Sequence, residues 1–376
     1  MKKGWNKYNL MDICNVSTGK HDANHAVENG KYRFYTCSSQ YVFCNTKRFE
    51  GECIILPGNG ANVGETYYYN GDFDAYQRTY VIDKIDNRII PMFLYYHFQN
   101  NWRSEGVAKQ YGSATNYIKI GNFKDYIVNA PQSLSEQQSI VAYLDSAFAK
   151  IDAMKANAEK ALNEAKALFQ ASLKEMLEPK EGWEEKKLGE VGTFVRGGNF
   201  TKRDFVEDGF PCIHYGQIHT TLGVATYGHL SCVPKSIVKA DRCATKGDLV
   251  IAITSEDDEG SCKCTAWMAD YDAFVGGHTA IYKHSLNPIF VSYYFKAARF
   301  QKAKLEFTHG FKVVEISPKD IAKIPISYPS LSEQQSIVNS LNNIKSKVDQ
   351  LQANFDKISQ ECDALKQAIL RQVFES

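Results

Sequence analysis

Two stretches of the chain carry apolar residues at the spacing of a coiled-coil helix. In the C-terminal stretch these residues alternate steps of four and three almost throughout, which is the pattern of a helical seam. They are Ile337, Leu341, Ile344, Val348, Leu351, Phe355, Ile358, Cys362, Leu365, Ile369 and Val373. Shifting this register back by 197 positions gives the seam expected in the earlier stretch: Ile140, Leu144, Ala147, Ile151, Met154, Ala158, Ala161, Ala165, Leu168, Ser172 and Met176. One seam is bulky and the other is rich in alanine, so we expect the two helices to interdigitate within the chain.

An identical eight-residue box, LSEQQSIV, opens both of these helical stretches, at 134–141 and at 331–338. The serine and the second glutamine of each box are expected to cap the helix, and the glutamate to complement its dipole. These residues are Ser135, Gln138 and Glu136 in the first copy, and Ser332, Gln335 and Glu333 in the second. About 43 residues would make a rod of about 65 Å. If the halves are related by a pseudo-two-fold axis, the rods run antiparallel with a globular module at each end.

The regions before each box have different sequences but share landmarks in the same order. Gly-Trp at 4–5 returns at 182–183, a glycine turn before an apolar strand occurs at 51 and 247, and a proline opens an apolar run at 91 and 288. The first region predicts strands at 32–36, 53–56, 65–69 and 79–82, followed by a helix at 91–105. We therefore interpret the two regions as diverged copies of one mixed α/β fold.

The predicted fold class is α+β, with two diverged α/β domains joined by two long helices that form an antiparallel coiled coil. The expected boundaries are 1–133 for the first domain, 134–180 for the central helix, 181–330 for the second domain and 331–376 for the C-terminal helix.

Composition narrows the possible functions. A net charge of +1 provides no global basic field, so DNA binding would depend on local patches or on partners that share the phosphate contacts. We find neither a signal peptide nor an apolar run of membrane-spanning length, and so expect no membrane association. The ten cysteines lack the paired spacing of a metal site, which favours free thiols in a reducing cytoplasm, with a zinc site as the alternative.

Several motifs resemble catalytic sites only in part. Asn287-Pro288-Ile289-Phe290 approximates the Asn-Pro-Pro-Phe signature of adenine methyltransferases, but it lacks the second proline, and no glycine-rich cofactor loop precedes it. Gly30-Lys31 lacks the rest of a phosphate-binding loop, and the acidic run 256–259 is typical of solvated surface. His278 and His309 have no serine or cysteine in a motif context. We therefore expect neither a catalytic residue nor a metal ligand set in this chain.

Recognition of DNA by loops remains, since it requires amide, hydroxyl, imidazole and cationic side chains that reach a groove or a phosphate. Candidates in the first domain are Asn59, Asn62, Gln77, Arg78, Lys109, Tyr111, Ser113, Thr115, Asn116 and Lys119. Candidates in the second domain are Arg196, Asn199, Lys202, Arg203, Thr254, Ser255, His278, His309 and Lys312.

Two variable modules, each closed by the same box and a long helix, resemble the specificity subunit of a type I restriction–modification system. The resemblance covers the whole chain and is carried by 131–141, 329–338, the two Gly-Trp pairs and the strands after Gly51 and Gly247. The loop with Gly112, Ser113 and Ile118 also resembles the end of a target-recognition domain, whereas the second copy departs from it at 309–312.

This resemblance implies that each domain reads one half of a bipartite double-stranded DNA target. It implies that the helices dock two methyltransferase subunits and that a restriction (translocase) subunit can join. S-adenosylmethionine, ATP and Mg²⁺ would then be bound by partner chains. Two other classes stay open at this stage, namely a stand-alone methyltransferase–endonuclease and a coiled-coil scaffold or regulator that binds protein.

Overall fold

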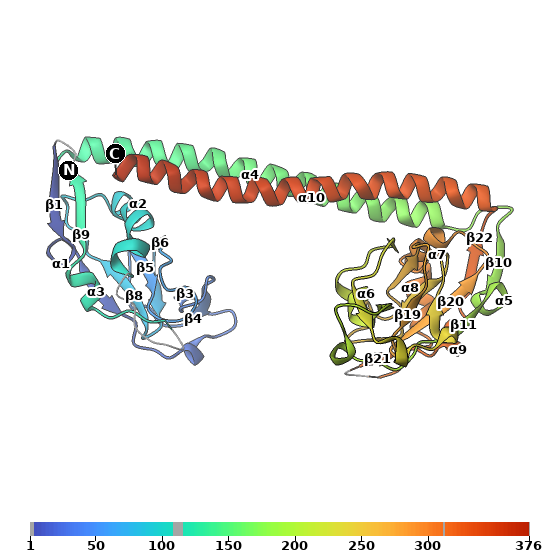
Figure 1. Cartoon of the computed structure of the whole chain (residues 1–376). Coiled ribbons are helices and arrows are strands. Elements are labelled where there is room, and N and C mark those ends of the chain that lie inside the picture. The colour runs from blue at the N-terminus through green and yellow to red at the C-terminus, as the bar shows by residue number, and fades with distance from the viewer. Residues whose placement is uncertain (1–3, 108–115, 311–312, 376) are drawn as a thin grey trace. The chain divides into compact units, whose positions relative to one another are not determined.

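The computed structural model describes residues 4–107, 116–310 and 313–375. It divides into two compact units, Met1–Glu159 with Asn354–Ser376, and Lys160–Ala353. Each unit contains one globular domain together with one end of each long helix (Figure 1). Among the described residues, no helix combines the length and the apolar character that crossing a bilayer requires.

The first unit holds two small sheets and a strand pair. The larger sheet has the order β2 (Asn15–Thr18), β8 (Thr79–Asp83), β5 (Glu52–Pro57), β6 (Tyr67–Asn70), all antiparallel. The smaller sheet has the order β4 (Val42–Cys44), β3 (Tyr32–Tyr35), β7 (Phe73–Ala75), and β1 (Trp5–Asn9) pairs with β9 (Ile127–Pro131). The helices are α1 (Leu10–Ile13), α2 (Pro91–Asn101) with a π-helical turn at Trp102–Gly106, and α3 (Gly121–Lys124). A 3₁₀ turn, η1, covers Ala23–His25.

The second unit repeats this arrangement with additions. Its larger sheet has the order β11 (Gly192–Arg196), β20 (Thr279–His284), β16 (Leu249–Ala252), β18 (Cys264–Trp267), β13 (Ala225–Thr226). Its smaller sheet has the order β14 (Ser231–Val233), β12 (Phe210–Ile213), β19 (Ala273–Val275), β15 (Cys243–Ala244). Two strand pairs join β10 (Glu184–Lys187) to β22 (Pro325–Tyr328) and β17 (Thr254–Ser255) to β21 (Val314–Glu315). The helices are α5 (Leu188–Val191), α6 (Tyr215–Thr220), α7 (Pro288–Tyr294), α8 (Ala298–Lys304) and α9 (Pro318–Ile321).

The shared strand order confirms that the domains are copies of one α/β fold. The order β2-β8-β5-β6 corresponds to β11-β20-β16-β18, and β4-β3-β7 corresponds to β14-β12-β19. The second copy adds β13 and β15 at sheet edges, together with α6. The longer sequence of the second module is therefore accommodated at its periphery.

The central strand of each larger sheet is buried on both faces. In β5, Ile54 and Leu56 pack in the core that contains Phe93 of α2, whereas the alternate residues Cys53 and Ile55 pack with Phe73 of the smaller sheet. Side chains of a strand alternate between faces, so an uninterrupted apolar run fits this position. In β16, Leu249 and Ile251 likewise lie in the core beside α7, and Val250 and Ala252 lie in the opposite cluster.

The first glutamine of each LSEQQSIV box fastens its domain to the long helix. The Gln137 side chain is fully buried; its Oε1 accepts the Ile90 N–H at 2.9 Å, and its Nε2 donates to the carbonyls of Arg88 and Pro131, each at 2.9 Å. Gln334 repeats the arrangement: its Oε1 accepts the Asn287 N–H and its Nε2 donates to the Pro329 carbonyl, both at 2.8 Å. We call Gln137 and Gln334 the clamp glutamines.

The expected capping residues of the long helices were wrong by two positions. α4 spans Leu134–Leu177 and α10 spans Leu331–Phe374. The serines that accept first-turn N–H groups precede the box: Ser133 Oγ accepts from Glu136, and Ser330 Oγ accepts from Glu333, each at 3.4 Å. The error arose because the serine inside the box already lies within the helix, where its carbonyl is used by the next turn, as Ser139 Oγ donates to Ser135 O at 2.9 Å.

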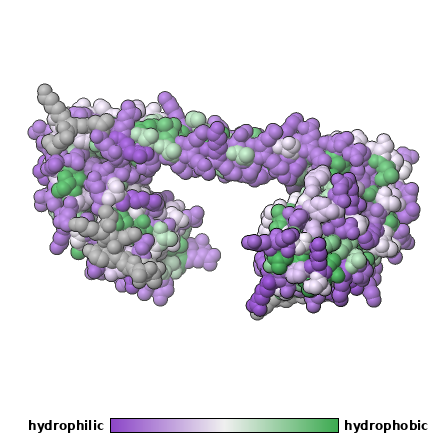
Figure 2. Space-filling view, in the orientation of Figure 1, coloured by the Kyte–Doolittle hydropathy of each residue, from purple (hydrophilic) through white to green (hydrophobic). Residues whose placement is uncertain are grey.

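Side-chain contacts show that α4 and α10 run antiparallel. Within the first unit, Asp152 pairs with Lys366 at 2.6 Å and Lys155 pairs with Asp363 at 3.6 Å, so position increases on one helix as it decreases on the other. Within the second unit, Lys166 Nζ donates to Gln352 Oε1 at 2.8 Å. The visible surface of both helices is largely hydrophilic (Figure 2).

The helical seam departs from the expected register in α4. Met154 and Leu168 are 58% and 60% exposed, Ala161 is also exposed, and in α10 Leu365 is 46% exposed, so these four residues were wrongly assigned to the seam. The bulky residues Phe148, Leu162 and Phe169 are buried instead. The alternation of four and three survives, but after Leu144 the longer step comes first. A helix rotates to bury its largest apolar side chains, and this preference outweighs an alanine register transferred from the other copy.

The clamp is testable with two adjacent residues of the same box. Gln137→Ala should lower the free energy of unfolding of the first unit by about 2–4 kcal/mol, because it leaves a partly buried N–H and two carbonyls, one of them buried, without this partner. Gln138 is exposed, so Gln138→Ala should change the stability by less than about 0.5 kcal/mol. Hydrogen exchange of first-unit peptides, read by mass spectrometry, measures both. Equal losses in the two variants would contradict the clamp.

The helical register is testable with a second adjacent pair. Phe169 is 8% exposed and packs near Tyr293, with ring centroids 6.3 Å apart, whereas Leu168 points to solvent. Phe169→Ala should therefore destabilise the second unit by about 3–5 kcal/mol through the cavity it leaves. Leu168→Ala should cost less than about 0.5 kcal/mol. Urea unfolding of the full chain measures both losses of stability. A larger loss for Leu168→Ala than for Phe169→Ala would support the register expected from sequence.

Candidate nucleic-acid interface

In the first unit, three loops that are distant in sequence are joined by backbone hydrogen bonds. Gly58 N donates to Arg78 O at 2.9 Å, and Gly60 N donates to Asn116 O at 2.8 Å. The turn after β5 needs glycine here, since a Cβ on Gly58 would lie 2.1 Å from the Arg78 carbonyl oxygen and Gly60 has φ +88°. The contacts bring the candidates Asn59, Arg78 and Asn116 to one group of neighbouring loops.

The candidate side chains in this group differ in how free they are. Gln77 and Arg78 are exposed, and within the described residues the Arg78 guanidinium has neither a carboxylate nor a ring partner. Asn62 instead braces the loop, because its Nδ2 donates to Cys37 O at 2.8 Å. Lys119 lies with its Nζ 5.6 Å from the centre of the Tyr117 ring. The candidates Lys109, Tyr111, Ser113 and Thr115 lie outside the described residues.

In the second unit, four candidates line one hollow of about 730 Å³: Arg196, Asn199, Lys202 and His278. His214 and Tyr215, which sequence reasoning missed, complete its polar wall. Glycines at 197, 198 and 277 also line the hollow and add no side chain to it. At Gly198 there is no room for one, because a Cβ would lie 2.2 Å from the Phe274 ring. Among the described residues that line the hollow, none is acidic, so the site favours an anion or a hydrogen-bonding base edge.

Three side chains determine the charge in the hollow: His214, Arg196 and Lys202. Burial, together with the charges of Lys202 and His278, lowers the pKa of His214. Its Nδ1 accepts the Gly216 N–H at 3.2 Å, so the neutral ring carries its proton on Nε2. Arg196 pairs with Glu315 at 3.3 Å, but both side chains are about half exposed, and solvent screens the pair. Lys202 remains an exposed cation at the rim.

The remaining candidates of the second unit do not share the hollow. Thr254 is only 7% exposed and lies in β17, paired with Glu315 of β21, so its assignment as a loop contact was wrong. Thr254 follows the apolar strand β16 and lies in the short strand pair of β17 with β21. The polar turn that comes next in the sequence made this residue look like part of a loop. Ser255 is half-buried in the same strand, and His309 is exposed and bridges to Glu315 through the backbone. Arg203 is exposed in a 3₁₀ turn, and Lys312 lies outside the described residues.

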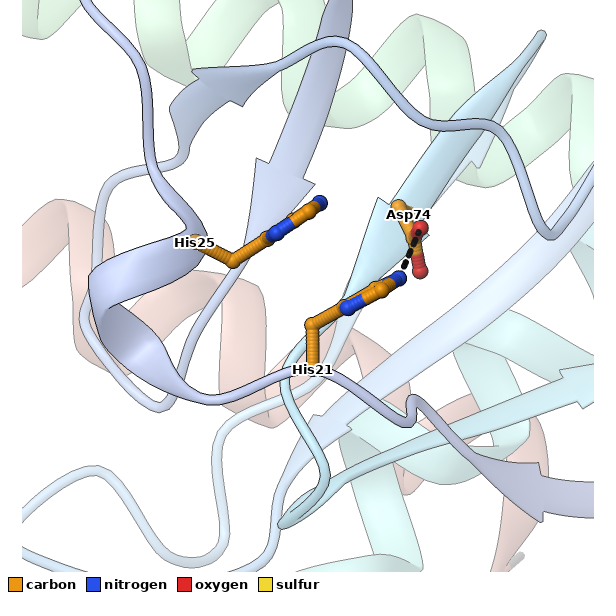
Figure 3. A group of neighbouring side chains, drawn as sticks. All are labelled: His21, His25 and Asp74. Atoms are coloured by element: carbon orange, nitrogen blue, oxygen red, sulfur yellow. Dashed lines mark ion pairs between the residues drawn. The ribbon is translucent and has the colours of Figure 1, made fainter.

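A separate group of titratable residues lies in the first unit, where sequence reasoning expected no metal ligands. His21, His25 and Asp74 each place one ligand-type atom within 4.8 Å of the others (Figure 3). The cysteine spacings on which the expectation was based do not bear on this group. The signal present in the sequence is the His-x-x-x-His spacing at 21–25, whereas Asp74 comes from a strand about 50 residues further on.

Tandem copies of one α/β fold, each with its own polar loops and each fastened to a long helix, define a two-domain recognition protein. The chain belongs to the family described as the type I restriction modification DNA specificity domain, because the family model matches residues 2–164 and 180–359.

Individual relatives support this membership. The specificity subunit of the type I restriction enzyme EcoDI from Escherichia coli is 25% identical over 98% of this chain and 88% of its own length. The StySPI specificity subunit from Salmonella potsdam is 24% identical over 50% of this chain and 42% of its own.

Two solved structures share the fold. One, from a study of complex assembly and conformational transition of the type I R-M system, has a TM-score of 0.74 at 19% identity and covers 99% of this chain and 98% of that chain. The HsdS subunit from Thermoanaerobacter tengcongensis has a TM-score of 0.57 at 17% identity and covers 100% of this chain and 98% of that chain. The predicted fold class is therefore confirmed.

Proposed function

We propose that this chain is the DNA-specificity subunit of a type I restriction–modification complex, in which each domain reads one half of a bipartite target and the chain itself performs no catalysis. The observation that carries the proposal is the combination of an equivalent clamp in both copies with reading loops that differ. Gln137 and Gln334 hold the two domains in the same way, whereas the loop side chains at corresponding places differ, as Arg78 and His278 do. Family membership makes a protein-binding scaffold the weaker alternative.

The proposal includes partners that supply the chemistry. Two methyltransferase subunits would dock on the helices, with S-adenosylmethionine on those subunits, and a restriction (translocase) subunit would bring ATP and Mg²⁺. The net charge of +1 supports shared phosphate contacts, since each neutralised phosphate needs a cation from some chain of the complex. Ten free cysteines, most of them buried, fit a reducing cytoplasm.

Arg78 should contact a phosphate or a guanine edge, because it is exposed and unpaired within the described residues. Arg78→Ala should weaken specific DNA binding by the methyltransferase complex about tenfold and, for a phosphate contact, reduce the slope of log affinity against log salt by about 1. Arg88→Ala is the matched control, because Arg88 is exposed in the same unit but pairs with Asp86 at 2.8 Å. Fluorescence anisotropy over a salt series measures both variants, and equal behaviour would remove Arg78 from the interface.

The function is tested by reconstitution. The purified chain alone should neither methylate nor cut DNA, and should confer sequence-specific adenine methylation when combined with its methyltransferase subunit. Single-molecule methylome sequencing reads the result as a bipartite motif that disappears when this chain is deleted. Methyl transfer by the lone chain would overturn the non-catalytic assignment, and an unchanged methylome on deletion would favour the scaffold.

Exchange of one domain extends the same test. Replacing residues 10–130 with another recognition domain should change one half of the motif and leave the other half intact, because the clamp contacts on the first domain are made to backbone atoms. Altered bases in both halves would show that the domains do not read independently.

A further inference from the structure

We propose that His21, His25 and Asp74 form a binding site for a divalent transition-metal ion of the zinc type, within the first recognition domain. The proposal goes beyond DNA specificity and does not depend on it. His21 precedes the turn of η1, His25 is its last residue, and Asp74 lies in the middle of β7 (Figure 3). The three side chains come from two separate segments and converge without a backbone distortion at any of them.

The distances suit a metal ion. His21 Nε2 lies 3.6 Å from Asp74 Oδ2, and the three ligand-type atoms are all within 4.8 Å of one another. Zinc bonds of 2.0–2.2 Å to nitrogen and oxygen place tetrahedral ligands about 3.4 Å apart, so small side-chain rotations complete the site. Two imidazoles and one carboxylate favour zinc, cobalt or nickel over magnesium and calcium, which prefer all-oxygen shells. Three protein ligands leave a fourth position for water.

The environment of Asp74 calls for a cation. Its carboxylate is 1% exposed, and a buried carboxylate is costly unless it is compensated. Its Oδ1 accepts the Ala75 N–H at 2.8 Å and its Oδ2 accepts the Thr46 hydroxyl at 2.6 Å, but these donors are neutral. Among the described residues, its ion-pair partner is His21, and no lysine or arginine reaches it.

The two imidazoles lie against each other beside the carboxylate. Their rings are stacked with centroids 3.7 Å apart and planes within 6°. The lone pairs of imidazole nitrogens lie in the ring planes, so the two rings turn out of this stack when both bind one ion. A divalent ion held by both nitrogens would compensate the buried carboxylate of Asp74. Because the Thr46 hydroxyl donates its hydrogen to Asp74, His25 Nε2 donates its N–H to Thr46 Oγ1 at 2.8 Å, which leaves the lone pair of Nδ1 for an ion.

The second domain shows that the fold does not require these polar groups. Gly19 N bonds to Thr79 O, as Gly197 N bonds to Thr279 O, and counting back from these threonines makes Phe274 the counterpart of Asp74. Phe274 is 1% exposed and packs on Phe200, with ring centroids 5.3 Å apart. An apolar pair therefore fills the same place in one copy, and the polar cluster of the other copy is a specific substitution.

The site would fasten a loop beside the reading surface. The His21 carbonyl accepts the Gln77 N–H at 2.9 Å, and Gln77 precedes the exposed Arg78. A metal ion held by His21 and Asp74 thus ties the loop before η1, the strand β7 and the turn of Arg78 into one rigid group. The metal ion would have a structural role next to the recognition loops, and its fourth coordination position would be open to solvent.

Cobalt titration of the full chain, purified without a histidine tag and stripped with EDTA, tests the proposal. One equivalent of Co²⁺ should bind and give the d–d absorption of a four-coordinate site without a thiolate charge-transfer band, and Zn²⁺ should displace it. His21→Ala and His25→Ala should each weaken binding by more than about 100-fold, beyond the effect of losing an outer-shell partner. His229→Ala is the matched control, because this exposed histidine contacts Tyr271 in the second unit.

The His21 side chain is 39% exposed, so its alanine variant should keep the fold, and thermal unfolding without metal verifies this. Asp74→Asn then serves as the isosteric test of the buried charge. Absence of a one-to-one cobalt complex, or wild-type affinity in the His21 and His25 variants, would show that the cluster is a hydrogen-bonded network that holds no metal. A thiolate band would assign the ion to a cysteine instead. Each outcome is read without DNA and is independent of the proposed function.

Discussion

The arrangement of each unit depends on one buried amide side chain. A glutamine near the start of a long helix carries both a donor and an acceptor, and each clamp glutamine uses both on backbone groups at the beginning of a domain helix and the end of a domain strand. An amide inside the protein is costly unless it is satisfied, and a satisfied one fixes position and orientation together. Apolar contacts alone would allow the helix to slide.

The clamp places no demand on the side chains of the domain that it holds. Its partners are the N–H of Ile90 and the carbonyls of Arg88 and Pro131 in one copy, and the N–H of Asn287 and the carbonyl of Pro329 in the other. The adjoining proline and tryptophan complete it, since Trp5 and Trp183 each donate Nε1–H to the box glutamate at 3.2 Å. Loop sequences can therefore diverge widely while the attachment stays constant. A protein of this family needs this property if its recognised DNA sequence is to change.

Sequence reasoning succeeded where many residues act together and failed where one residue decides. The repeated box, the apolar strand at β5 and the proline-started helices were enough to predict two α/β copies and two long helices. The phase of the α4 seam was wrong because it turns on whether Phe169 or Leu168 faces inward, and alternating heptad steps fit both. The role of the first box glutamine was missed because its partners are backbone atoms, which leave no mark in a sequence.

The candidate site shows the same division. Polar loop residues were identified in both domains, but the sequence does not show that Asn62 is used as a brace or that Thr254 is buried in a strand. His21 and Asp74 are about 50 residues apart, and the backbone contact of His21 with the segment that follows β7 brings them together.

Many surface cations of this chain are already paired with carboxylates, which is consistent with recognition of a DNA sequence without strong sequence-independent binding. Arg103 pairs with Glu65, Arg196 with Glu315 and Lys47 with Asp72, so several cations near the loops are already balanced. Exposed pairs of this kind are weak, at about 0–1 kcal/mol, and a phosphate can replace the carboxylate at little cost. On the proposed function, this exchange would favour contacts of good geometry and would keep the sequence-independent part of the chain's own DNA affinity small. If the proposed partner subunits supply most of the phosphate contacts, the two domains can contribute mainly discrimination between DNA sequences.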